Sequence, residues 1–183
     1  MTTVVVDEKF DRFANDYFLF LALRYQLDPR RIKIVLLDDR SWKTTMPAQL
    51  RRATEGNPQP QPITLTLQSN TAGRPNEDDK KIGLELAGFT EEQAEDLRHY
   101  DAALFLNSDR PARMKKTGEK LLWNIVIAHH VLHMVELMTG QRIIIEPLDK
   151  HDYEERESIK HFNRFTAWVG GPDTMIDRYV PTK

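Results

Sequence analysis

The most constraining feature of this sequence is the run LLWNIVIAHHVLHMVELM over residues 121–138, which is apolar on nearly every side of a helix. Such a helix lies inside a protein or a membrane, because a surface helix has one polar side. Three histidines, an asparagine and a glutamate inside the run make a bilayer unfavourable. We therefore expect a central buried helix of a protein that is not in the membrane, running from about Met114 to Met138 and ended by Gly140.

The rest of the chain predicts short strands and further helices around this one. Strand patterns occupy Arg31–Leu37, Ile63–Leu67 and Ala102–Asn107, with a fourth short strand at Arg142–Glu146, while helical patterns occupy Asp7–Gln26, Ala48–Thr54, Thr90–Tyr100 and Asp152–Val169. Residues 70–81 have almost no apolar side chain, so we expect an exposed loop there. A chain of 183 residues builds about one core. The prediction is a single domain over residues 1–183 of the α+β class, with a small mixed sheet packed on the central helix.

Composition excludes several classes of function. The chain has no cysteine, so disulfides, thiolate nucleophiles and cysteine-ligated zinc are excluded. Its net charge of −2 gives no overall attraction for a polyanion, so nucleic acid is not the expected partner. The first residues, MTTVVVDEKF, have no basic start and no full apolar stretch of a secretory signal, and we expect a cytoplasmic protein.

Three polar residues share one side of the central helix. His129, His133 and Glu136 are four and three positions apart, and residues at that spacing lie on the same helix face. Two imidazoles one turn apart are the arrangement by which a helix presents two nitrogens to zinc, and burial keeps them neutral and able to bind it. The alternative is a pair of core histidines whose hydrogen bonds are satisfied within the protein.

Two stretches resemble a family of metal-dependent peptidases. The strand AALFLNS, a basic connection and the helix LLWNIVIAHHVLHMVE are similar to the strand and A-H-E-x-x-H helix of zincins. Further on, HFNRFTAWVGGP resembles the E-A-N-x-F-A-x-x-L-L-M-P stretch of the ImmA/IrrE-type family, with Asn163, Phe165, Ala167 and Pro172 in register. The resemblance covers residues 100–172 and implies a zincin-like fold.

Carried over residue by residue, the resemblance implies a zinc site with three histidines. His129 and His133 stand at the two helix ligands, and His161 stands where the family has a glutamate ligand. His130 stands where the family has its catalytic glutamate. A three-histidine site leaves one coordination position for water or substrate, so this ligand set is chemically sound. His151 is an alternative third ligand.

The general base of such a site has three candidates. His130 is a candidate because an ordinary imidazole titrates near neutral pH. Glu136, on the same face as His129, and Glu157, one turn before His161, are the other candidates for a catalytic or ligand-orienting role. For Glu157 the alternative is a solvated acidic turn.

Three functions therefore remain open from the sequence. The first is a zinc-dependent peptidase or other hydrolase acting on a protein substrate. The second is a catalytically inactive relative that acts as a regulatory module by binding a protein partner, such as a DNA-binding repressor; loss of the family's catalytic glutamate favours it. The third is a structural or regulatory α+β protein whose histidines belong to the core.

Overall fold

The structure of this chain is a computed structural model that describes residues 8–52, 63–66, 76–107, 109, 113–143 and 151–181. At positions 8, 10, 11, 52, 66 and 151–158 the description covers the backbone alone. In chain order the elements are α1 (Glu8–Tyr25), η1 (Pro29–Arg31), β1 (Ile32–Leu37), α2 (Asp39–Thr44), α3 (Ala48–Arg52), β2 (Ile63–Thr66), α4 (Glu77–Leu86), α5 (Glu91–Leu97), β3 (Ala102–Asn107), α7 (Thr117–Thr139), α8 (His151–Val169) and α9 (Pro172–Tyr179).

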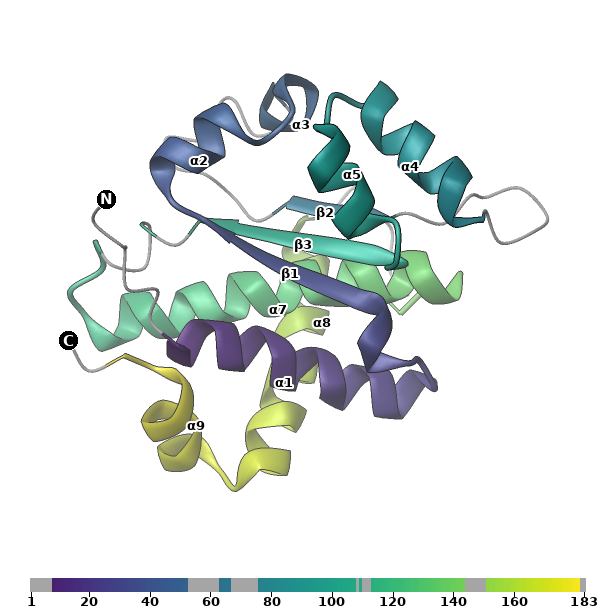
Figure 1. Ribbon diagram of the computed structural model, residues 1–183. Coiled ribbons are helices and arrows are strands. Elements are labelled where there is room, and N and C mark those ends of the chain that lie inside the picture. Colours follow the sequence, from purple (N-terminus) through teal and green to yellow (C-terminus); the bar gives the residue numbers. More distant parts are fainter. Residues whose placement is uncertain are drawn as a thin grey trace.

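The described strands form one mixed sheet with β3 in the middle (Figure 1). β1 pairs with β3 in parallel, and β2 pairs with β3 in the antiparallel direction. All six residues of β3 are buried, as expected for a central strand covered on both faces. The predicted α+β class with a small mixed sheet is therefore confirmed.

Helices cover both faces of the sheet, because side chains alternate along each strand. Leu104 and Leu106 point into a large core formed with α1, α7, α8 and α9. Ala103 and Phe105 point into a second core on the opposite face, where Trp42 and Leu97 pack from α2 and α5. Figure 1 shows the same division, with α2, α3, α4 and α5 on one side of the sheet and α1, α7, α8 and α9 on the other.

Helix α7 is the central helix that the sequence predicts. Trp123, Ile127, Val131 and Leu132 are almost wholly buried along it. Gly140 ends it in the left-handed conformation with φ of 66°. By length and composition alone, α7 is the one described helix that would be able to cross a membrane, but it packs against α1, α8 and the sheet. These contacts make it the central helix of the described fold.

Two expectations about loops and strands were wrong within the described residues. Positions 77–81, expected in an exposed loop, form the first half of α4, and residues 142–143 are not a strand. The remaining parts of those two segments, 70–75 and 144–146, lie outside the described residues. Helices α2 and α9 were not anticipated, because they have only six and eight residues and a short helix carries few periodic positions.

Helix α4 forms because of a cap and a buried ion pair. The Asn76 side chain accepts a hydrogen bond from Asp79 N at 2.8 Å, which satisfies one backbone donor at the helix start. Lys80 then reaches inward, so that its Nζ lies 3.2 Å from Asp101 Oδ1 and donates to the Tyr100 carbonyl at 2.9 Å. Arg31 Nη2 donates to the same Asp101 oxygen at 2.6 Å. A lysine in a polar stretch gives no local sign of this burial.

Candidate functional site

One side of α7 is only partly covered by the rest of the fold, and it carries the histidines. We call it the histidine face and define it by Leu122, Ile125, Val126, His129, His130, His133, Glu136 and Leu137. These positions fall within one half of the helix circumference at 100° per residue. Leu122 is 61% exposed and Leu137 is 59% exposed, whereas the three histidines between them are half-buried.

His129 and His133 are in contact on this face. Their ring centroids are 4.5 Å apart and their planes meet at 85°, so the edge of one imidazole meets the face of the other. The contact follows from the four-residue spacing, which places one side chain a turn above the other. The histidine face therefore holds two imidazoles close enough to act together on one small ligand.

Glu136 fixes the orientation of His133. His133 Nδ1 lies 3.1 Å from Glu136 Oε2, and the other carboxylate oxygen, Oε1, accepts a hydrogen bond from the backbone N–H of Ile143 at 2.9 Å. When Nδ1 carries the proton and donates it to Glu136, Nε2 carries the lone pair that a metal needs. The hydrogen bond from Ile143 to this carboxylate also holds the chain beyond Gly140 against α7.

His130 has a different environment from its neighbours. Burial, together with charge repulsion between the protonated ring and the nearby His129 and His133, lowers the pKa of His130 from 6.5 to about 3. Its ring lies 5.5 Å from that of His129. An imidazole with so low a pKa is neutral at physiological pH and is a weak base, which makes it poorly suited to accept a proton in catalysis.

His161 lies in the interface between α8 and α1. It is 3% exposed, and its Nε2 is 3.4 Å from the Tyr25 hydroxyl oxygen. Tyr25 had no predicted role, and no local pattern signals the contact because it joins residues 136 positions apart. The Tyr25 hydroxyl occupies the nitrogen that an Nε2 ligand would use.

The described side chains do not bring the predicted ligand set together. Among them, no group of three or more histidine, aspartate or glutamate side chains is spaced to hold a metal ion. The structure thus joins His129 with His133 and His133 with Glu136, while His161 is placed with Tyr25. The side chains of Glu157 and His151 lie outside the description, so their predicted roles stay predictions.

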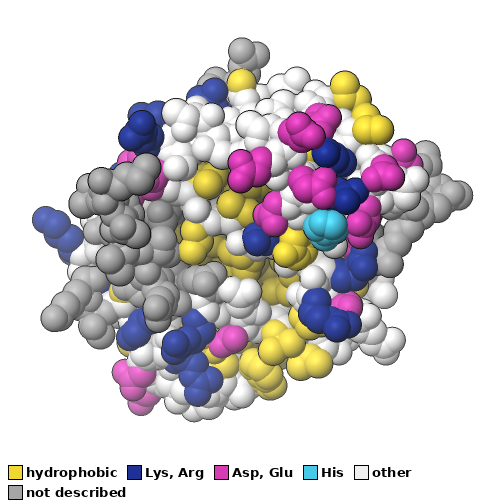
Figure 2. All heavy atoms as spheres, in the orientation of Figure 1, with side chains coloured by type: hydrophobic (Ala, Val, Ile, Leu, Met, Phe, Trp, Pro, Cys, Tyr) yellow, Lys and Arg dark blue, Asp and Glu magenta, His cyan; other side chains and the backbone are white. Residues whose placement is uncertain are grey.

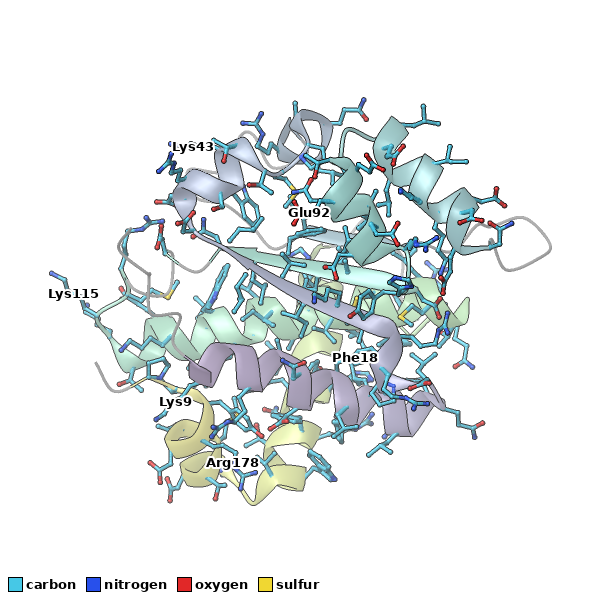
Figure 3. The ribbon with its side chains drawn as sticks, viewed as in Figure 1. Lys9, Phe18, Lys43, Glu92, Lys115 and Arg178 are labelled. Carbon is cyan, nitrogen blue, oxygen red and sulfur yellow. The ribbon has the colours of Figure 1, made fainter. Side chains whose placement is uncertain are left out.

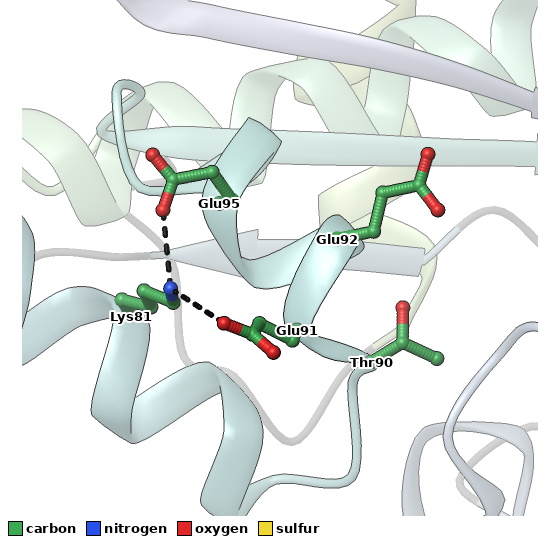
Figure 4. A pocket seen from close by; sticks show the side chains of 5 residues that line it. All are labelled: Lys81, Thr90, Glu91, Glu92 and Glu95. Atoms are coloured by element: carbon green, nitrogen blue, oxygen red, sulfur yellow. Dashed lines mark hydrogen bonds and ion pairs between the residues drawn. The ribbon is translucent and has the colours of Figure 1, made fainter.

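A hollow lies between α4 and α5, on the other side of the sheet from the histidine face (Figures 1 and 4). Lys81 extends from α4, and its Nζ lies 3.4 Å from Glu91 and 3.2 Å from Glu95. Figure 4 shows Glu92 pointing away from this cluster. These are solvent-accessible ion pairs between neighbouring helices, which contribute little to stability and present no converging group for a ligand.

Comparisons of the chain with family models, with curated proteins and with solved structures gave no match.

Proposed function

We propose that this chain is a zinc-binding protein whose metal is held on the histidine face of α7. The observation that carries the proposal is the edge-to-face pair of His129 and His133, 4.5 Å apart, with Glu136 oriented onto His133 Nδ1. Carboxylate–histidine pairs of this kind orient imidazole ligands in metal sites. Two histidines on adjacent turns are the half-site that a helix contributes to a zinc centre.

The third ligand of the proposed site comes from outside α7. The resemblance to ImmA/IrrE-type peptidases implies His161, and ligation through its Nε2 requires that the contact with Tyr25 be given up. The more specific proposal is a zincin-like site in which three histidines bind the zinc. Zinc bound in that way supplies a Lewis acid that polarises a carbonyl or a bound water. The cysteine-free composition favours a cytoplasmic location for such a protein.

If the protein hydrolyses a protein substrate, we propose that a carboxylate is the general base. Glu136 and Glu157 remain the candidates, because the low pKa of His130 makes it the weakest base of the three. Glu136 already accepts two hydrogen bonds, from His133 and from the Ile143 backbone, which favours an orienting role for it.

Zinc content of the purified chain, measured by elemental analysis after zinc is added and excess is removed, tests the proposal. We expect about one zinc per chain, lost in His133→Ala and retained in His99→Ala. His99 is the matched control, because its exposed ring contacts Glu77 on another part of the surface. Glu136→Gln should weaken zinc affinity by about 10- to 100-fold, the usual effect of losing a carboxylate behind a ligand.

The outcome with His161→Ala separates the two forms of the site. Loss of zinc in that variant supports the three-histidine site, and retention leaves the histidine pair of α7 as the protein's contribution. Zinc absent from the parent, or present equally in the parent and His133→Ala, would overturn the proposal.

The second candidate function is a regulatory module that binds a protein partner. It is favoured by Leu122 and Leu137, two large apolar side chains that remain more than half exposed at the two ends of the histidine face. A contiguous exposed apolar patch is typical of an interaction surface, and the partly exposed Ile125 and Val126 continue the apolar surface from Leu122 along α7. If this function holds, a protein partner that co-purifies with the parent should not co-purify with Leu122→Asp, while the zinc content stays unchanged. Equal recovery of that partner with the parent and with Leu122→Asp would count against this function.

A further inference from the structure

Helices α1 and α8 leave an apolar patch on the surface where they meet. Near the end of α8, Trp168 is 51% exposed, and on α1 Leu23 is 66% exposed, with the exposed Leu19 one turn before it. Phe20 joins the two helices, because its ring centroid lies 5.5 Å from that of Trp168. Figure 2 shows apolar side chains gathered low on the molecule, where α1 and α8 lie in Figure 1. We call this surface the α1–α8 patch and define it by Leu19, Phe20, Leu23, Arg24, Arg164 and Trp168.

Trp168 differs from the other two tryptophans of the chain. Trp42 and Trp123 are buried in the two cores of the fold. An exposed tryptophan leaves a large apolar ring in water, so its coverage by a partner is favourable. Tryptophan and arginine are among the residues most enriched at the positions that dominate protein–protein binding.

Two arginines lie beside this tryptophan. Arg24 follows Phe20 by one turn of α1, and Arg164 precedes Trp168 by one turn of α8. Residues four positions apart share a helix face, so the ring contact between the two helices brings both arginines to the same surface. The α1–α8 patch therefore combines an exposed aromatic ring, two leucines and two guanidinium groups.

The protein does not neutralise these two arginines. Both are exposed, and within the described ranges neither Arg24 nor Arg164 forms a hydrogen bond, an ion pair or a ring contact. The acidic residues that flank Arg24 in the chain are engaged elsewhere, because Asp16 accepts a hydrogen bond from a tyrosine of α9 and Asp28 pairs with Arg30. The patch thus has an excess of positive charge that an anionic partner would meet.

The composition of α8 leaves this excess in place. Positions 159–169 of the helix contain no aspartate or glutamate, and the next acidic residue, Asp173, lies in α9 beyond the two glycines that separate the helices. Guanidinium groups bind carboxylates through two parallel N–H donors, which gives the contact direction as well as charge. Four other described arginines already pair with carboxylates within the chain, namely Arg30, Arg31, Arg98 and Arg113.

The apolar and basic parts together favour an acidic protein segment over other anionic partners. Nucleic acid offers no aliphatic side chains for the two leucines, and the net charge of −2 gives no general attraction for a polyanion. Proteins that lie on anionic bilayers use clusters of many basic residues, whereas this patch has two unpaired arginines. An amphipathic helix that packs its apolar side against two neighbouring helices matches the patch in both respects.

We propose that the α1–α8 patch docks an acidic amphipathic helix of another protein. Its apolar side chains cover Trp168 and the leucines of α1, and its carboxylates pair with Arg24 and Arg164. The patch shares no residue with the histidine face of α7, so this interaction forms with or without metal.

Tryptophan fluorescence of the full chain, titrated with a synthetic helical peptide that has leucines on one side and glutamates beside them, tests the proposal. We expect saturable binding with a shift of emission to shorter wavelength, because Trp168 is the tryptophan that leaves water. Trp168→Phe should lose this shift. The paired variant Arg24→Glu with Arg164→Glu should bind the peptide at least about tenfold more weakly, because it sets like charges across the interface.

The matched control is Lys43→Glu with Lys115→Glu, which changes the net charge of the protein by the same amount. Both lysines are exposed, one on α2 and one before α7, away from the α1–α8 patch (Figure 3). This variant should bind the peptide nearly as the parent does, and circular dichroism checks that each variant is folded. A second peptide with glutamine in place of every glutamate tests the same charges on the unaltered protein and should also bind at least about tenfold more weakly.

Three results would overturn the proposal. The first is no saturable binding of the acidic peptide to the parent. The second is equal binding of the glutamate and glutamine peptides. The third is an emission shift with phosphatidylserine vesicles or a single-stranded oligonucleotide but none with the peptide, which would assign the patch to a membrane or to nucleic acid.

Discussion

Replacing His130 by glutamine should remove much of the loss of stability that this protein suffers on mild acidification. Burial and the neighbouring His129 and His133 lower the pKa of His130 to about 3, while the unfolded chain titrates near the ordinary value of 6.5. Between these two values the unfolded state binds more protons than the folded state, so stability falls as the pH falls. The contribution is intact above about pH 6.5 and is lost progressively below it.

The magnitude follows from the two pKa values. Between pH 7 and pH 5, a group with pKa near 6.5 in the unfolded chain and about 3 in the folded one costs about 2 kcal/mol of folding free energy. Glutamine is neutral at both pH values and of similar size, so the variant lacks this term. The difference between parent and variant isolates His130, because every other titrating group is common to both proteins.

Urea unfolding of the parent and of His130→Gln at pH 7 and pH 5 measures this difference. The parent should lose about 2 kcal/mol more than the variant between the two pH values. His99→Gln, at an exposed histidine that contacts Glu77, should behave as the parent does. Equal pH dependence in the parent and His130→Gln would refute the reasoning, because it would mean that His130 titrates normally in the folded protein.

Two further changes test the packing that supports this fold. The Lys80 side chain is 3% exposed, and in Asp101→Ala its ammonium keeps only the Tyr100 carbonyl among its described partners. We expect this variant to lose about 3–5 kcal/mol of unfolding free energy, measured by urea unfolding. A loss below about 1 kcal/mol would show that Lys80 reaches solvent. Gly140→Ala forces an alanine into the left-handed conformation at φ of 66° and should cost about 1 kcal/mol, measured in the same way. Gly118→Ala is the control and should not destabilise the protein, because Gly118 lies in the first turn of α7 and has no positive φ.

Elements whose signals are local could be predicted from the order of residues alone. Apolar residues on all sides of 121–138 predicted the central helix, and short runs rich in β-branched and apolar residues predicted the three described strands within a residue of where they lie. Thr90 followed by Gln93 predicted the start of α5, which has the reciprocal capping bonds of that pattern. Spacing also predicted that His129 and His133 share a face, since that is a property of any helix.

Tertiary structure decided the features that depend on partners distant in the chain. The Asn76 cap of α4 is a local signal, whereas the burial of Lys80 against Asp101, which is 21 positions away, is not visible in any local pattern. The His161–Tyr25 contact spans 136 positions, so it was likewise invisible in the sequence. The pKa of His130 depends on how far the fold excludes water from that ring, a quantity set by packing. Local periodicity follows from the order of residues alone, whereas burial and pairing depend on which elements meet in space.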